Sequence, residues 1–380
     1  MDTQEKLQER RELIDNAWKF KRNPRMPLWG CCGNWKIFDA GYRLGEVFSD
    51  YELREKVVMD FQERYQFDVH TDNLNGMPMN VLKASGGFLS IDATDEVLSI
   101  DDYSVMEPDE YGEFAYNREE FYWTKAYKRM CKPGLTLGEL KQAAIARVEH
   151  EAYSAKIRER YLNECGTLTT LSGMPSIAPF ETIFSPLRGI KGASLDIRKN
   201  KSKMIEVMDH MCETQLKPNI ERALRPDIAP WAITSLSSMF IGLALLNVKQ
   251  FEELYWPYLR LPIEAAIANN KPMFIFSEGS MLRFAEFFQD IPKGVLMIHI
   301  EQDDIFEFRK RLPNIAVVGG MPTKLLGHGT PEECVDYAKM LMDTLGEGFI
   351  LSSDKPLYYK NDARRENLQA VNEFISNYQY

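Results

Sequence analysis

The chain has 380 residues, of which 44% are hydrophobic and 27% charged, the composition of a globular protein with a large core. Its 56 acidic and 46 basic residues give a formal net charge of −10. This balance argues against nucleic acid or an anionic membrane as the main partner, because both require clustered Lys and Arg. The length allows two ordinary domains, or one (β/α)8 barrel with additional N-terminal elements.

The N-terminus and the cysteines predict a cytoplasmic protein. Residues 1–25 are charged and lack the apolar core of an export signal. The longest apolar stretch, 239–246, is far shorter than the roughly 20 residues that span a bilayer. The cysteines show no disulfide-framework spacing, and a disulfide between adjacent Cys31 and Cys32 would be strained, so a reduced compartment is expected. The sequence does not indicate an oligomeric state.

The N-terminal part of the chain predicts helices and one antiparallel strand pair. We expect helices at 5–21, 50–65 and 137–163, an apolar segment at 26–31, a loop at 70–78 and antiparallel strands within 86–101. The first of these helices forms an N-terminal extension covering residues 1–25.

From residue 167 onward, short apolar runs rich in β-branched residues alternate with helical periodicity. The predicted strands are 167–171, 229–236, 273–277, 295–300, 315–319 and 349–352, and the predicted helices are 200–224, 251–268, 280–288, 304–310, 331–345 and 364–378. Thr330 as N-cap and Pro331 at the first position mark a helix start.

The alternation of strand and helix indicates an α/β protein with a parallel sheet. Buried strands spaced by about 20 to 40 residues favour a closed barrel. We therefore predict a single (β/α)8 TIM-type barrel domain over 1–380, with a helical extension and a β-hairpin near its N-terminus. A doubly wound open sheet is the alternative, but no G-x-G-x-x-G follows a predicted strand.

Candidate site residues follow from the predicted strand ends, where barrel enzymes carry their chemistry. Glu278 directly follows strand 273–277, and His299 lies at the end of strand 295–300. Asp354 comes directly after the last predicted strand. These side chains are therefore expected near one another at one end of the barrel.

Each of these residues also has a structural interpretation. A histidine at a strand end can be a hydrogen-bonded core residue, Glu278 can stabilise the first turn of the next helix, and Asp354 can be a turn residue. Glu301, Asp303 and Asp304 form an acidic cluster that is typical of a helix start.

Several blocks of the chain carry a resemblance to a known family. They are 106–111 (MEPDEY), 319–322 (GGMP), 329–335 (GTPEECV), 348–352 (GFILS) and 365–370 (RENLQA). Their order and spacing resemble the uroporphyrinogen-decarboxylase superfamily, especially its corrinoid-dependent methyltransferases. The resemblance covers roughly residue 24 to the end and implies a (β/α)8 barrel.

Decarboxylation of a porphyrinogen is disfavoured within this superfamily. The decarboxylase of this superfamily binds the many carboxylates of its substrate through an Arg-rich N-terminal motif. The corresponding segment here, 22–34, reads RNPRMPLWGCCGN and lacks that spacing. Buried carboxylates without paired arginines are costly, so a polycarboxylate substrate does not suit this chain.

The resemblance also implies a zinc site with altered ligands. The methyltransferases bind zinc through His-x-Cys at one strand end and a Cys near the last strand. Here Glu278 stands at the Cys position of the first pair, His299 follows at the end of the next strand, and the closing position falls near Asp354. The resemblance therefore implies zinc held by Glu278, His299 and Asp354. In bacterial O-demethylases a further upstream Glu belongs to the motif; the nearest match, Glu264, falls in a predicted helix nearer the other end of the barrel.

Carboxylate and imidazole ligands make zinc a stronger Lewis acid than thiolates do, which suits an ether oxygen. The resemblance thus implies the methyltransferase component of an O-demethylase of anaerobic one-carbon metabolism. It would move a methyl group from a methoxylated, aromatic compound to the cobalt of a corrinoid. The chain has no D-x-H-x-x-G corrinoid-binding segment, so the corrinoid is expected on a separate protein. Methyl transfer from a methylcorrinoid to a thiol or pterin, decarboxylation, and a non-catalytic binding barrel remain alternatives.

Overall fold

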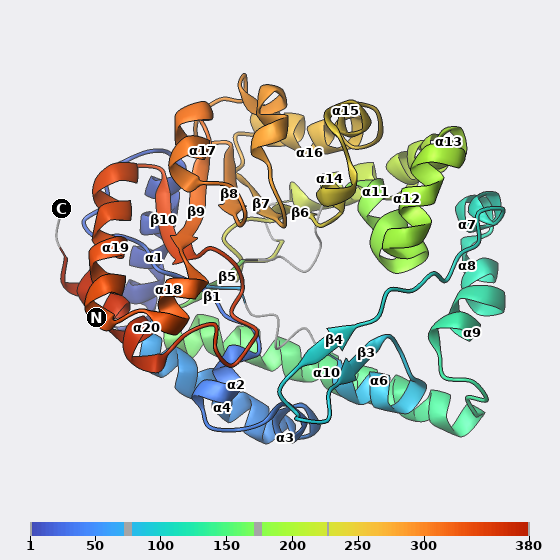
Figure 1. Ribbon diagram of the computed structural model, residues 1–380, viewed down its shortest axis with the longest axis horizontal. Coiled ribbons are helices and arrows are strands. Elements are labelled where there is room, and N and C mark those ends of the chain that lie inside the picture. Colours follow the sequence, from blue (N-terminus) through green and yellow to red (C-terminus); the bar gives the residue numbers. More distant parts are fainter. Residues whose placement is uncertain (1, 72–77, 171–176, 226–227, 379–380) are drawn as a thin grey trace.

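The computed structural model describes residues 2–71, 78–170, 177–225 and 228–378 (Figure 1). The strands are β1 (Trp29–Cys31), β2 (Val69–Thr71), β3 (Leu89–Ile91), β4 (Leu98–Ile100), β5 (Leu168–Thr169), β6 (Leu236–Phe240), β7 (Met273–Ser277), β8 (Leu296–Ile300), β9 (Ala316–Met321) and β10 (Phe349–Ser353).

The α-helices are α1 (Thr3–Trp18), α2 (Trp35–Asp39), α3 (Leu44–Ser49), α4 (Tyr51–Tyr65), α6 (Met79–Ser85), α7 (Tyr111–Tyr116), α8 (Arg118–Phe121), α9 (Tyr127–Met130), α10 (Leu137–Arg160), α11 (Pro179–Thr182), α12 (Gly189–Lys199), α13 (Lys201–Met211), α14 (Lys217–Ala223), α15 (Val248–Leu254), α16 (Trp256–Ala268), α17 (Ile305–Arg311), α18 (Thr323–His328), α19 (Pro331–Leu345) and α20 (Arg365–Asn377). Short π-helical segments are η1 (Tyr122–Ala126), η2 (Tyr161–Cys165), η3 (Ile183–Arg188) and η4 (Cys212–Leu216), and 3-10 segments are η5 (Gly242–Leu245) and η6 (Leu282–Phe288).

Two parallel sheets form the centre of the molecule. One has the order β10-β9-β8-β7-β6 and the other the order β1-β2-β5. β7, β8 and β10 are buried along their whole length, which explains why their sequences are apolar without alternation. The predicted α/β class with a parallel sheet is confirmed.

Single parallel bridges connect the two sheets at both edges. Leu28, just before β1, pairs with Leu351 of β10. Thr169 of β5 pairs with Ala232, just before β6. This arrangement is consistent with a TIM-like fold.

One buried cluster contains side chains from seven of these eight parallel strands, and the partly buried Met239 of β6 packs against it. Leu7, Ile14, Ala17 and Trp18 of α1 belong to the same cluster. The indole nitrogen of Trp18 donates to the carbonyl of Val295, just before β8, at 3.2 Å. Helix α1 therefore covers the amino ends of the strands.

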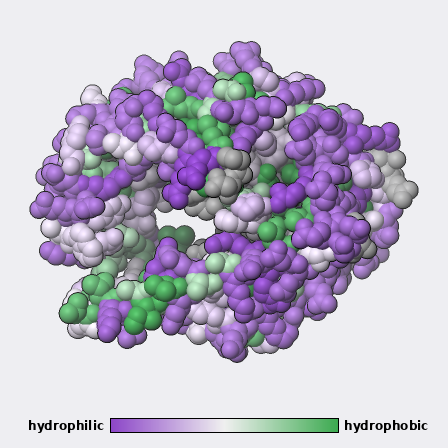
Figure 2. All heavy atoms as spheres, turned by 180° about the vertical axis from the view of Figure 1, so that it is seen from behind, coloured by the Kyte–Doolittle hydropathy of each residue, from purple (hydrophilic) through white to green (hydrophobic). Residues whose placement is uncertain are grey.

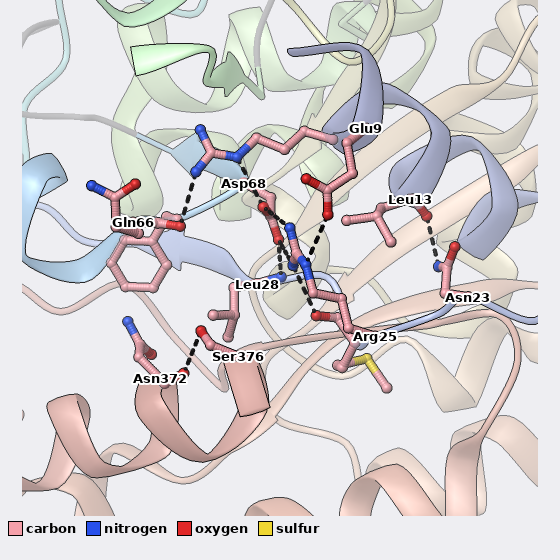
Figure 3. Close-up of polar contacts among 12 residues, drawn as sticks. Glu9, Leu13, Asn23, Arg25, Leu28, Gln66, Asp68, Asn372 and Ser376 are labelled. Atoms are coloured by element: carbon pink, nitrogen blue, oxygen red, sulfur yellow. Dashed lines mark hydrogen bonds and ion pairs between the residues drawn. The ribbon is translucent and has the colours of Figure 1, made fainter. Parts of the chain in front are cut away.

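A buried ion cluster lies at the same amino-terminal end (Figure 3). Asp68, directly before β2, accepts hydrogen bonds from the guanidinium groups of Arg10 (3.0 Å) and Arg25 (2.8 Å at each oxygen). It also accepts from the backbone of Leu28 (2.8 Å). One carboxylate thus joins α1, the segment before β1 and β2. In TIM-type barrels this end serves stability, whereas chemistry occupies the other.

Distant parts of the chain meet at the carboxyl-terminal helix. The indole nitrogen of Trp35 in α2 donates to the carbonyl of Ala363, 328 positions away, at 2.9 Å. Arg365 of α20 pairs with Asp39 at 2.8 Å. These two contacts therefore connect helix α2 with helix α20 and the segment just before it.

Most predicted elements recur, with differences at prolines. Strands predicted at 273–277, 295–300, 315–319 and 349–352 correspond to β7 to β10. β6 begins where the predicted strand 229–236 ends, because Ala229 has a positive φ of 52° and Pro230 lacks a backbone donor.

The helix predicted at 251–268 is divided into α15 and α16 where Pro257 interrupts the backbone hydrogen bonds, and the helix predicted at 280–288 is the 3-10 segment η6. The strand pair predicted within 86–101 is the hairpin β3–β4. Residues 72–77 of the predicted loop and residue 171 lie outside the described residues.

No helix within the described residues has both the length and the apolar content needed to cross a bilayer. The six cysteines, all of which are described, form no disulfide.

Candidate active site at the strand ends

The predicted site residues lie at the carboxyl ends of the parallel strands. His299 belongs to β8, Glu278 directly follows β7, and Asp354 directly follows β10. The backbone of Glu278 donates to the carbonyl of Phe240 in β6, and that of Asp354 to the carbonyl of Met321 in β9, both at 2.8 Å. Both residues therefore extend the strand pairing at the edge where parallel-strand enzymes hold their active sites.

His299 is buried and presents one ring nitrogen without a partner. Its side chain is 1% exposed, and its ring stacks on that of Phe276 with 5.1 Å between centroids. Nε2 lies 3.1 Å from the carbonyl oxygen of Ser353. Because a carbonyl oxygen only accepts, Nε2 carries the ring proton, and Nδ1 has no hydrogen-bond partner among the described residues. Burial lowers the pKa of His299 to about 4, so the ring is neutral at pH 7 and the Nδ1 lone pair is available.

Glu278 and Glu301 are neighbouring carboxyl groups. Glu301 Oε2 accepts a hydrogen bond from the backbone of Gly279, next to Glu278, at 2.8 Å. Burial and then the charge of Glu301 raise the pKa of Glu278 to about 7. A carboxyl group with this pKa can hold a proton at neutral pH or release it when a cation arrives.

Glu181 in α11 lies close enough for its charge to be coupled to Glu278. It is 4% exposed, and its oxygens accept from the backbones of Ile241 (3.0 Å) and Gly242 (3.0 Å) and from the hydroxyl of Tyr255 (2.7 Å). Burial, assisted by the charge of Glu278, raises the pKa of Glu181 to about 7 even though these hydrogen bonds lower it. The bonds hold the chain where it leaves β6, so Glu181 positions Ile241.

The sequence interpretation did not identify Glu181 and assigned Glu301 to a helix start. A signal for Glu181 exists, because it is the one charged residue in the apolar run 177–184. For Glu301 the signal is strand alternation, which places it on the same face as His299. The other two acids do have structural roles: Asp304 is the N-cap of α17, and Asp303 accepts from the backbone at the start of η6.

Asp354 is bonded to the next helix along the sheet edge. Its Oδ1 accepts from the backbone (3.0 Å) and the hydroxyl (2.5 Å) of Thr323, and thereby caps α18. Glu264 is 61% exposed on α16, 4.0 Å from Arg260. It lies outside the site, in keeping with its predicted position in a helix.

The donor chemistry suits a metal only in part. His299 is neutral, and its bond to a backbone carbonyl is the outer contact that zinc-binding histidines commonly make. Glu278 adds a carboxylate of the type that zinc accepts. However, no three His, Cys, Asp or Glu side chains of the described residues are grouped as ligands of one ion. Metal binding would therefore require donor side chains at these strand ends to move toward one another.

An apolar groove of about 1280 Å³ opens beside the end of β6. Its walls come from α6, the hairpin β3–β4, α9, α10, η3 and α12. Ile241, which Glu181 holds in place, is part of its lining. Figure 2 shows the molecule hollowed in its middle, seen from behind. Because Ile241 directly follows β6, the lining of the groove reaches the end of this strand.

No model of a known protein family matches this chain, and no curated protein matches it in sequence. A solved structure of a methyltransferase from Methanosarcina mazei has a similar fold, with a TM-score of 0.63 over 97% of this chain and 98% of that chain. The two sequences are 12% identical, so the likeness establishes the fold and leaves the chemistry to the residues of the site.

Proposed function

We propose that this protein transfers a methyl group from a methoxylated, aromatic substrate to the cobalt of a corrinoid carried by a separate protein. In the proposed reaction cobalt(I) of the corrinoid attacks the methyl carbon, the carbon–oxygen bond of the methyl ether breaks, and a methyl–cobalt(III) bond forms with the electron pair that cobalt supplies. The electron pair of the broken bond stays on oxygen, which leaves as a phenolate and takes up a proton.

The observation that carries this proposal is the state of His299. A buried, neutral imidazole at a strand end, with a bare Nδ1 and the other nitrogen held by a carbonyl, has the properties expected of a metal ligand and supports the proposal. Glu278 lies at the corresponding end of the neighbouring strand. The fold shared with a protein named a methyltransferase supports the same class of reaction.

Zinc is the metal that we propose for this site. Glu278 and His299 would be ligands, with Asp354 as the third through Oδ2, because its Oδ1 is engaged with Thr323. Bound zinc would supply Lewis-acid stabilisation of the negative charge that develops on the ether oxygen. The fixed Nε2 bond of His299 would keep its ring oriented throughout.

We also propose that the eight parallel strands form a closed barrel. The bridges Leu28–Leu351 and Thr169–Ala232 support closure at both edges. The buried cluster, with members from seven of these strands and Met239 of β6 packed against it, supports a filled interior. In a closed barrel, Glu278, His299 and Asp354 would surround one mouth.

Elemental analysis tests the proposal first. Wild-type protein purified without chelator should contain close to one zinc per chain, and Glu278→Ala and His299→Ala should each lose it. Glu264→Ala is the matched control, because it removes an exposed carboxylate of the same family motif and should retain the metal.

The reaction itself is tested by incubating the wild type with a methoxylated aromatic compound and cob(I)alamin, followed by its absorbance change. Zinc-free wild-type protein, or zinc retained in both site variants, would overturn the Lewis-acid site. Zinc without methyl transfer would overturn the proposed reaction and leave the site standing.

A further inference from the structure

The turn that follows β7 is held in place by side chains from the loop that follows β8. The turn comprises residues 279–282 and connects Glu278 with η6. Glu301 directly follows β8, and its Oε2 accepts a hydrogen bond from the backbone N–H of Gly279 at 2.8 Å. That N–H belongs to the peptide bond that joins Glu278 to Gly279. The carboxylate of Glu301 therefore fixes the orientation of the peptide that leaves Glu278.

Asp303, two residues beyond Glu301, holds the rest of the turn. Its Oδ1 accepts from the hydroxyl of Ser280 at 2.5 Å. Its Oδ2 accepts from the backbone N–H groups of Met281 (2.6 Å) and Leu282 (3.0 Å). The two carboxylates together accept four hydrogen bonds from the turn, so the loop after one strand determines the conformation of the loop after its neighbour.

The peptide on the other side of Glu278 is fixed through β6. The N–H of Glu278 donates to the carbonyl of Phe240 at 2.8 Å. The next two N–H groups along that strand end, those of Ile241 and Gly242, donate to the buried carboxyl of Glu181, both at 3.0 Å. The backbone of Glu278 is therefore held on both sides, by a strand bond before its α-carbon and by a carboxylate after it.

Packing leaves one side of Gly279 open. Its φ is 92°, in the region that favours glycine. Apart from its chain neighbours, no heavy atom of the described residues lies within 4 Å of the position that a Cβ would occupy. Glycine has more backbone freedom than any other residue. The bond to Glu301 therefore restrains a peptide that side-chain packing leaves unrestrained on this side.

Asp304, the next acid in the same loop, is bonded to its own helix instead. It accepts from the backbones of Phe306 (2.9 Å) and Glu307 (3.0 Å) and caps α17. The cap at Asp304 serves the helix that follows, whereas Glu301 and Asp303 serve the turn beside Glu278. The loop thus contains a matched pair of roles, one of which can be removed without the other.

We propose that Glu301, assisted by Asp303, is a positioning residue that orients Glu278 for metal binding. This inference rests on the proposed function, because it concerns the zinc site of that reaction. The ring of His299 is restrained in a comparable way by its Nε2 bond to the carbonyl of Ser353. The rearrangement on metal binding is then confined to side-chain rotation, so less conformational freedom is lost and the affinity for zinc is higher.

Zinc affinity, measured by competition with a chromophoric chelator, tests this role without any turnover. Glu301→Ala removes the acceptor for the N–H of Gly279, whereas Glu301→Gln keeps an oxygen for the same bond. We expect Glu301→Ala to weaken zinc binding at least about tenfold and Glu301→Gln to recover most of that loss. Asp303→Ala should weaken it less than Glu301→Ala, because its bonds lie further from Glu278.

Gly279→Ala disturbs the same peptide while both carboxylates stay in place. The added methyl group meets no described side chain, but the positive φ is strained for alanine. Zinc affinity should therefore fall in this variant too, which keeps the test decisive if Glu301→Ala fails to fold. Asp304→Ala is the matched control: it should lower stability in urea unfolding through loss of the α17 cap and leave zinc affinity unchanged.

Unchanged zinc affinity in both Glu301→Ala and Gly279→Ala would overturn the positioning role while the zinc site stands. Equal losses in Glu301→Gln and Glu301→Ala would overturn it as well, because the charge of Glu301 would then matter and its bond to Gly279 would not. An equal loss in Asp304→Ala would attribute the effect to stability. Wild-type protein without zinc would overturn the proposed site, and this inference with it.

Discussion

The ring of His299 in β8 donates through Nε2 to the carbonyl of Ser353 in β10, spanning β9 at a distance of 3.1 Å. This single bond determines which nitrogen carries the proton, and it leaves Nδ1 as a buried acceptor without a partner among the described residues. A buried polar atom without a partner costs free energy, so its retention at a strand end is consistent with a ligand role.

Replacing His299 by Phe separates a structural role from a ligand role. The change keeps a ring beside Phe276 but removes both nitrogens. Loss of the bond to Ser353 costs about 1–3 kcal/mol, whereas removal of the unpartnered nitrogen returns a similar amount, so the net change should stay within about 2 kcal/mol. Urea unfolding of chelator-treated protein measures this, and zinc binding should be lost. A much larger loss of stability with zinc binding intact would identify a core residue.

Asp354 can be tested with two substitutions. Asp354→Asn keeps an oxygen for Thr323 but removes the carboxylate charge. We expect unfolding free energy within about 1 kcal/mol of the wild type and zinc affinity at least about tenfold weaker. Asp354→Ala should lose about 1 kcal/mol more, because α18 loses its cap. If zinc affinity is unchanged in Asp354→Asn, Asp354 is not a zinc ligand and only caps α18.

The buried carboxyl of Glu181 predicts a specific pH dependence in metal-free protein. Burial raises its pKa from 4.5 to about 7 in the folded state. Between these values the unfolded chain releases the proton while the folded chain keeps it, so the free energy of unfolding falls as pH rises. The slope from this group is at most about 1.4 kcal/mol per pH unit, and it vanishes below about pH 4.5 and above about pH 7.

Glu181→Gln should therefore flatten this decline when urea unfolding is measured from about pH 5 to about pH 8. Glu278 contributes in the same direction, since its pKa is also raised to about 7. Some decline should accordingly persist in the single variant and be smaller in the double variant Glu181→Gln with Glu278→Gln. If the free energy of unfolding depends on pH in the same way in the wild type and in Glu181→Gln, the raised pKa of Glu181 is contradicted.

Removal of Asp68 should be the most damaging of these changes. Its carboxylate is 1% exposed and binds Arg10 and Arg25 together (Figure 3). Asp68→Ala would leave Arg10, which is 5% exposed, without its counter-charge, at a cost of about 3–5 kcal/mol. Glu9→Ala is the control, because its bond to Arg25 is partly exposed and is worth less than about 1 kcal/mol. In thermal unfolding, the melting temperature should therefore fall much further in Asp68→Ala than in Glu9→Ala.

Local signals in the sequence predicted much of the fold. The helix predicted at 331–345 has the bounds of α19, because Thr330 and Pro331 mark its start unambiguously and the capping box with Glu333 is present. β7 was predicted with its observed bounds, because a short apolar run with a helix on each side leaves few alternatives. β6 was shifted, because Ala229 has a positive φ and Ala232 forms only a single bridge with Thr169, which lies far away in the chain.

The site could be predicted only where it depends on strand ends. Glu278 and His299 lie where the alternation of strands and helices placed them. Glu181 could not be placed, because its bonds reach residues 60 positions further along the chain. The capping bond between Asp354 and Thr323 could not be predicted either, because the two residues follow different strands and meet only when β9 and β10 pair. Which carboxyls share one pocket is a property of the assembled sheet, and no local pattern encodes it.

The bond between Trp35 and Ala363 has a consequence for the time order of synthesis. These residues are 328 positions apart, so the acceptor does not exist until the whole stretch between them has been made. At about 5–20 residues per second, the indole waits on the order of half a minute for its partner. Throughout that interval the side chain of Trp35, which is 2% exposed in the folded protein, lacks the core packing that it shares with Leu368 and Val371 of α20.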